Sequence, residues 1–155
     1  MQISFPIEFL VNGTPVSLSS QNAKAKERWK ERIKYASSRA LPNPHFASIE
    51  RHSITIYYFP AEPMQGDVDN IVKLILDGMS GHVYVDDRQV ERIVVQKFEP
   101  GNIFSFSKPT ALMIEAGNVE GEIAAWYTPA AFWPNVNELK APVLTCVPDV
   151  VMTEF

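Results

Sequence analysis

The sequence predicts one α/β (α+β) domain in which a mixed β-sheet is flanked by helices. Apolar and polar residues alternate at 2–11 and at 48–59, as in strands with one buried face. At 21–40 and 68–79 the apolar residues instead recur every three or four positions, as in amphipathic helices. With 155 residues, 46% apolar and 21% charged, the chain is long enough to bury a core of its own.

Charge and cysteine content narrow the class of protein. The net charge of −4 argues against a general nucleic-acid binder, but residues 1–63 carry +3, residues 64–115 carry −3 and residues 116–155 carry −4. No apolar run reaches the length of a membrane span, and the N-terminus lacks the basic start of a signal peptide. Cys146 is the only cysteine, so an intrachain disulfide is excluded and we expect a cytoplasmic protein.

The first third of the chain predicts a strand followed by a basic helix. The strand at 2–11 ends in an Asn12-Gly13 turn, and Ser19 or Ser20 is expected to cap a helix that ends before Pro42. The helix has a narrow apolar stripe and a surplus of cations. The apolar stripe comprises Ala25, Trp29, Ile33 and Ala36, and the residues expected to contact DNA phosphates are Lys24, Lys26, Arg28, Lys30, Arg32 and Lys34. A solvated face with acid–base pairs has the same pattern, so both interpretations stay open.

Residues 66–97 are the most informative stretch, with six carboxylates separated from the apolar residues. A helix over 68–79 gathers its apolar side chains on one side and its polar side chains on the other. Asp67 is a natural N-cap, and Lys73 follows Asp69 by four residues and precedes Asp77 by four. The apolar side comprises Val68, Ile71, Val72, Ile75, Leu76 and Met79.

The second half of this stretch predicts a strand at 82–85, an acidic loop at its end and another strand from Val90 to about Phe98. Asp86-Asp87 in that loop would face the start of the helix, where Asp67 and Asp69 lie. Carboxylate oxygens are the ligands that Mg²⁺ takes, and Lys73 could neutralise charge on a phosphate. Either acid pair alone is more often a helix cap or a turn. Their conjunction with Asn70 and Lys73 favours a metal-dependent phosphodiesterase site.

This arrangement resembles the signature of RusA-type Holliday-junction resolvases, endonucleases common in phages and prophages. The resemblance rests on about thirty residues, namely Asp67-x-Asp69-Asn70-x-x-Lys73-x-x-x-Asp77, Gly81, Asp86-Asp87-x-Gln89-Val90 and Lys97. It implies a RusA-like fold and a homodimeric enzyme that resolves four-way DNA junctions by paired cuts with Mg²⁺, for which Mn²⁺ can substitute. The motif departs from the family at Ser80, where asparagine is common, and at residues 60–65, where relatives often have basic residues or a proline.

The resemblance also implies roles for individual residues. Asp67, Asp69 and Asp87 match the essential metal-binding acids, Lys73 matches the catalytic lysine, and Asp86 matches a metal-site acid of lesser weight. Asp77 and Gln89 match motif positions whose role is expected to be structural. Independently of the resemblance, His82 is the histidine nearest the motif and could approach the metal, but a lone histidine at a strand start is more often structural.

The resemblance covers residues 1–116, the predicted endonuclease domain, with its last strands expected at 103–106 and 111–115. Residues 117–155 are aromatic and proline-containing, and we expect an accessory segment that packs on the domain or across a dimer. Two other functions stay open from the sequence. The chain could bind junctions without cutting them, or its acids could bind metal for stability with no DNA role.

Overall fold

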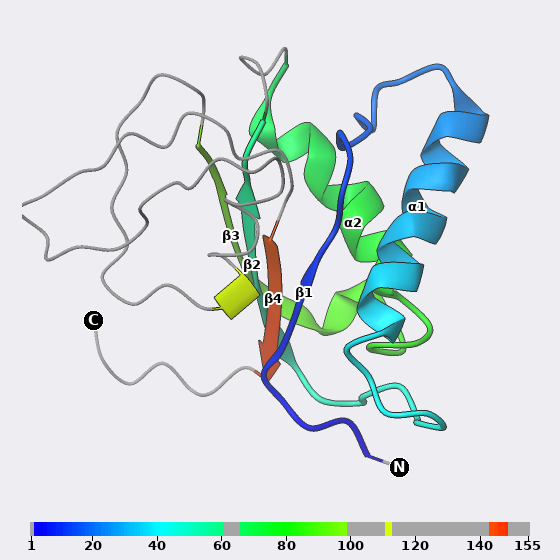
Figure 1. The fold of residues 1–155 in the computed structure, drawn as a ribbon, viewed down its shortest axis with the longest axis vertical. Helices are drawn as coiled ribbons and strands as arrows, with labels where there is room; N and C mark the ends of the chain where they lie inside the picture. The colour runs from blue at the N-terminus through cyan, green and yellow to red at the C-terminus, as the bar shows by residue number, and fades with distance from the viewer. Residues whose placement is uncertain (1, 61–65, 99–110, 113–142, 149–155) are drawn as a thin grey trace, which may run out of the picture.

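The structure is a computed structural model that describes residues 2–60, 66–98, 111–112 and 143–148 (Figure 1). Both α-helices lie on the same side of the sheet (Figure 1). The elements in chain order are β1 Ile7–Leu10, α1 Ala23–Ser38, β2 His52–Tyr58, the short 3-10 helix η1 Val68–Ile71, α2 Val72–Met79, a second 3-10 helix η2 Asp87–Gln89, β3 Val90–Lys97 and β4 Val143–Pro148.

The sheet has four strands in the order β1-β4-β2-β3. β2 and β3 are parallel, and β4 is antiparallel to both of its neighbours, β1 and β2. The connection between the parallel strands runs through η1 and α2, so it forms a crossover that covers one sheet face. The prediction of an α/β (α+β) fold with a mixed sheet and helices is confirmed.

β4 comes from the C-terminal segment 117–155, yet it lies inside the sheet. Its residues pair with both neighbours: Cys146 lies opposite Ile7 of β1 and opposite Ile54 of β2. The remainder of that segment lies outside the described residues. The division into a domain at 1–116 and an accessory segment at 117–155 stays a prediction.

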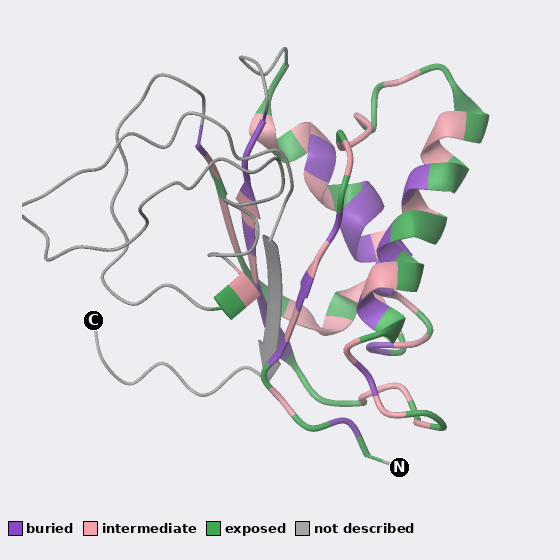
Figure 2. Cartoon of the chain, viewed as in Figure 1, coloured by how far each residue is buried: buried purple, intermediate pink, exposed green. Residues whose placement is uncertain are grey.

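The core lies between the sheet and the two helices. Figure 2 shows buried positions on the sides of α1 and α2 that face inward and exposed positions along the outer side of α1. Gly78 brings the helices close together, since a Cβ atom at this position would lie 2.6 Å from Cβ of Ile33. The buried core includes Ile7, Phe9, Trp29, Ile33, Ile54, Ile56, Ile75 and Met79.

The predicted apolar faces of both helices are buried at their larger residues and partly buried at Ala25, Ala36, Val68 and Val72, but some element boundaries differ from prediction. The N-cap of α1 is Asn22, whose side chain accepts a hydrogen bond from the Ala25 N–H (2.9 Å); Ser19 and Ser20 lie before the helix. The first strand is shorter than predicted, and the second begins at His52 because Ser48 makes only an isolated bridge with Tyr84.

Around the acidic stretch, the helix predicted over 68–79 has those bounds, whereas the strand predicted at 82–85 was wrong. The helix expected over 68–79 begins with the 3-10 turn η1 and becomes an α-helix only at Val72. The strand expected at 82–85 is a turn, because Gly81 has φ +83° and its N–H donates to the Tyr84 carbonyl (2.7 Å). Asp86 and Asp87 therefore follow a tight turn instead of a strand.

The strand predicted at 103–106 lies outside the described residues. The strand predicted at 111–115 was wrong at residues 111–112, which are helical, and its remainder lies outside the described residues. In the described ranges, no helix combines the length and apolar character that crossing a membrane requires.

Candidate functional site

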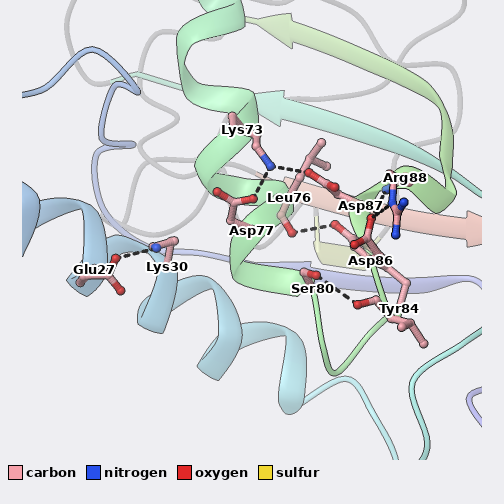
Figure 3. Close-up of polar contacts among 11 residues, drawn as sticks. Glu27, Lys30, Lys73, Leu76, Asp77, Ser80, Tyr84, Asp86, Asp87 and Arg88 are labelled. Carbon is pink, nitrogen blue, oxygen red and sulfur yellow. Dashed lines mark hydrogen bonds and ion pairs between the residues drawn. The ribbon is translucent and has the colours of Figure 1, made fainter.

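Lys73 joins the helical and the loop parts of the predicted site. Its Nζ donates to Asp77 Oδ1 (2.6 Å), one turn further along α2, and to Asp87 Oδ2 at the start of η2. Figure 3 shows the ammonium between these two carboxylates, which come from different elements. All three side chains are partly exposed, so a solvent-borne ligand can reach them.

The two carboxylates keep Lys73 charged. Hydrogen bonds to Asp77 and then to Asp87 raise the pKa of the Lys73 ammonium above its usual value of 10.5. A lysine with a raised pKa is a fixed cation at physiological pH. It is therefore suited to stabilising negative charge and unsuited to acting as a base.

Asp86 has a structural task at the start of η2. Its Oδ1 accepts from the Arg88 N–H (2.9 Å) and from Arg88 Nε (2.9 Å), while its own N–H donates to Gln89 Oε1 (2.9 Å). This reciprocal capping box satisfies backbone donors of the short helix. The hydrogen bonds from Arg88 lower the pKa of the Asp86 carboxyl below its usual value of 3.8, so it is charged at neutral pH.

Gln89 anchors the same turn to the preceding part of the chain. Its Nε2 donates to the carbonyls of Ser48 (2.9 Å) and Glu50 (2.7 Å), while its Oε1 serves the capping box. The hydroxyl of the buried Tyr84 donates to the Leu76 carbonyl (2.8 Å), which fixes the turn against α2. These contacts hold Asp87 opposite Lys73, in keeping with a structural role for Gln89.

Asp67 and Asp69 lie at the entry to the helix that carries Lys73. Asp67 occupies the N-cap position of η1, but its side chain makes no capping hydrogen bond, and both carboxylates are exposed. Within the described ranges, neither acid forms a salt bridge. η1 also contacts β3, the strand that follows Asp87 and η2. Both acids are therefore open to a ligand from solvent.

The structure does not bring the four predicted metal ligands, Asp67, Asp69, Asp86 and Asp87, into one cluster. In the part of the chain that is described, no three acidic, histidine or cysteine side chains are grouped closely enough to hold a metal ion. The donor chemistry nevertheless suits Mg²⁺, because these acids offer hard oxygens and Mg²⁺ keeps several waters. Asp87 already binds a cation, the Lys73 ammonium. We conclude that the four carboxylates are chemically suitable ligands for a hard divalent cation.

The six predicted DNA contacts fall into two rows. On α1, Trp29, Ile33 and Ser37 form the buried stripe, and the cations lie on its two sides at four-residue spacing. One row is Lys24, Arg28 and Arg32; the other is Lys26, Lys30 and Lys34.

The two rows have different neighbours. Arg32 Nη1 donates to the Asn12 carbonyl (3.0 Å) just after β1, so its row lies on the β1 side. Lys26 Nζ donates to the Leu18 carbonyl (2.5 Å), and the Leu18 N–H donates to the Asn70 carbonyl (2.8 Å), so the second row lies on the side of η1 and α2. Figure 3 shows Lys30, paired with Glu27 at 2.6 Å, on the side of α1 nearest Asp77.

The pairing of Lys73 with Asp87 is the contact that sequence reasoning missed. The four-residue spacing from Lys73 to Asp77 was visible in the sequence, but Asp87 lies fourteen residues away, beyond a turn that was predicted as a strand. The capping box and the Gln89 hydrogen bonds hold the η2 turn in the position that brings Asp87 into contact with Lys73. The sequence signal that could have found it is Asp86-x-x-Gln89, a capping-box spacing.

Comparison with known proteins identifies the family of this chain. A search of curated proteins found no match. The family model described as Endodeoxyribonuclease RusA matches residues 16–103, which is more than half of the chain and includes Lys73, both acid pairs and the basic helix. The chain therefore belongs to the RusA endodeoxyribonuclease family.

Proposed function

We propose that this protein is a Mg²⁺-dependent endonuclease that resolves four-way DNA junctions by paired phosphodiester cleavage. The observation that carries the proposal is the Lys73 ammonium at Asp87, with the exposed acids Asp67 and Asp69 at the entry to the same helix. This arrangement lies within the region that matches the family. A fixed cation beside open carboxylates is what phosphodiester chemistry requires.

Each residue has a role in this proposal. Asp67, Asp69 and Asp87 would hold the divalent cation, with Asp86 beside them as a weaker contributor because Arg88 already engages it. When bound, Mg²⁺ or Mn²⁺ supplies an activated water and offsets charge on the phosphate oxygens. Lys73 stabilises the negative charge that develops on the phosphate during cleavage. Gln89 keeps the η2 turn in place.

We also propose that two copies act together, since a four-way junction has two-fold symmetry and resolution needs two cuts. The basic residues of α1 would contact the phosphates of the junction arms. Light scattering with and without junction DNA tests the dimer, and a monomer under both conditions would exclude it. Cytoplasmic localisation, expected from the sequence, stays part of this proposal.

The decisive experiment is cleavage of a labelled synthetic four-way junction beside linear duplex of the same sequence. Wild-type protein should make paired cuts in the junction with Mg²⁺ or Mn²⁺ and none with chelator. Asp69→Asn, which keeps the side-chain size and removes the charge, should abolish cleavage, and Lys73→Ala should slow it by about 10²–10³-fold. Junction binding without cleavage by the wild type would instead support a non-cleaving binding module. Metal binding with no DNA effect would support a structural role for the acids.

A further inference from the structure

Lys73 has two carboxylate partners that differ in how they are held. Asp77 lies on the same helix, four residues on, so the helix itself keeps its carboxylate within reach of the Lys73 ammonium (2.6 Å). Asp87 reaches the same ammonium from η2, a separate element positioned by the turn before it. An ammonium has three N–H donors, so both contacts coexist.

Asp87, but not Asp77, is also a proposed ligand of the divalent cation. Two cations at one carboxylate repel each other. A divalent ion carries twice the charge of the Lys73 ammonium, so it attracts the carboxylate more strongly. The Lys73 ammonium and the metal ion therefore compete for Asp87. Asp77, outside the proposed ligand set, stays available to Lys73 when Asp87 is taken.

We propose that Asp77 is a positioning residue that retains the Lys73 ammonium when a divalent cation displaces it from Asp87. This inference rests on the proposed function, because it takes Asp87 as a metal ligand. Asp77 then keeps the lysine at the site, ready to contact the scissile phosphate. Without Asp77, Asp87 is the remaining carboxylate partner of the ammonium in the described part of the chain, and the ammonium then competes with the metal for that carboxylate.

The inference predicts a specific order of metal affinities. Mn²⁺ binding to the full chain without DNA, measured by calorimetry or by the free-ion electron paramagnetic resonance signal, should be about two- to fivefold tighter in Lys73→Gln, the range for a partly exposed ion pair. Asp77→Asn should bind Mn²⁺ about two- to fivefold more weakly than wild type. Asp77→Glu should restore most of the wild-type affinity.

The double variant separates positioning from simple charge. If Asp77 acts through Lys73, Asp77→Asn should have no further effect on Mn²⁺ affinity once Lys73 is already glutamine. If Asp77 only attracts cations through space, the variant should weaken binding equally in both backgrounds. The second result would overturn the proposal. Circular dichroism melts of all five proteins confirm that each one is folded.

Junction cleavage by the wild type distinguishes failure of this inference from failure of the proposed function. If the wild type cleaves junctions but Asp77→Asn weakens Mn²⁺ binding equally with and without Lys73, the role of Asp77 is overturned and the endonuclease proposal stands. If the effect of Asp77→Asn on Mn²⁺ affinity depends on Lys73 but the wild type cleaves no junction, the displacement of Lys73 from Asp87 by the metal stands and the endonuclease proposal is overturned. A wild-type protein that binds no Mn²⁺ would overturn both. In an active enzyme, Asp77→Asn should lower kcat more than it raises KM for the junction.

Discussion

His82 is a half-buried titratable side chain outside the catalytic proposal, in the turn after α2. Its Nε2 is 2.6 Å from the hydroxyl of Ser37, a fully buried residue of α1, so the pair joins α1 to the turn that follows α2. Burial lowers the pKa of His82 below its usual value of 6.5. A hydrogen bond with the Ser80 backbone opposes this shift, and the charges of Lys34 and His45 add to it. The folded state therefore favours neutral His82.

This pKa shift predicts acid sensitivity. A histidine whose pKa is lower in the folded state binds fewer protons there than in the unfolded chain, so folding stability falls as pH drops below about 6.5. The slope from this one group cannot exceed about 1.4 kcal/mol per pH unit. Urea unfolding from pH 8 to pH 5.5 measures the slope in wild type and in His82→Gln. A slope unchanged by the substitution would assign the acid sensitivity to other groups.

At the scale of elements, the contact between α1 and α2 depends on one glycine. A Cβ atom on Gly78 would lie 2.6 Å from Ile33 Cβ and 3.0 Å from the Lys30 carbonyl oxygen, so the helices must separate to accept it. Helix propensity alone predicts that Gly78→Ala stabilises the protein by about 1 kcal/mol. We expect the opposite, a loss of about 1–3 kcal/mol from overpacking.

Denaturant unfolding shows whether Gly78→Ala raises or lowers the free energy of unfolding, with Glu31→Ala as the control. Glu31 is exposed on α1, away from α2, and its substitution should change stability by no more than about 0.5 kcal/mol. A Gly78→Ala protein more stable than wild type would show that the helices separate at little cost.

The basic helix makes a prediction about the path of DNA. Its cations form two rows on opposite sides of the buried stripe, and the row on the α2 side lies nearer the proposed site. The exposed Lys34 belongs to that row, and the exposed Arg28 belongs to the row on the β1 side. We expect Lys34→Ala to lower the salt slope of junction binding by about 0.9, the value for one lost phosphate contact.

Arg28→Ala is the matched control for that measurement, since it removes one exposed cation from the same helix. Fluorescence anisotropy of labelled junction over a range of NaCl concentrations gives the slope for each protein. An effect of Arg28→Ala alone would place the DNA on the β1 side of α1, away from Lys73.

The elements set by local pattern could be predicted from the sequence. The three- and four-residue spacing of Trp29 and Ile33, and of Ile71, Ile75 and Met79, correctly gave the buried helix faces. The strand expected at 82–85 failed because four residues after Gly81 fit a tight turn as well as a strand, and alternation over so short a run does not separate them.

At the scale of the whole molecule, the sheet depends on a pairing that no local pattern reveals. β4 inserts between β1 and β2, so Ile7 lies opposite Cys146, a partner almost the length of the chain away. Strand order is set by the total burial that the sheet and helices achieve together, and an apolar run such as 143–148 fits several places equally well. The contact between Lys73 and Asp87 could not be predicted from local pattern either, because it forms only when α2 and η2 are both in place.

This topology predicts that the last part of the chain is needed for folding. In the described sheet β1 pairs only with β4, and β2 has β4 as one of its two neighbours. A chain ending at residue 116 loses that strand, and solvent reaches the ladder beside Ile7, Phe9, Ile54 and Ile56, all of which are buried. Each such side chain contributes about 1.5–3 kcal/mol by burial, so exposing two of them removes a large share of a usual stability of about 5–15 kcal/mol.

We therefore expect the 1–116 chain to lack a cooperative thermal transition, whereas a chain ending at residue 148 keeps the transition of the full protein. Circular dichroism melts of the three chains test this. Addition of a peptide spanning 139–150 to the short chain should restore part of the transition, because an added strand can pair with both open neighbours. A 1–116 chain that melts at the full-length temperature would show that the two halves of the sheet close without β4 and that residues 117–155 are an accessory segment.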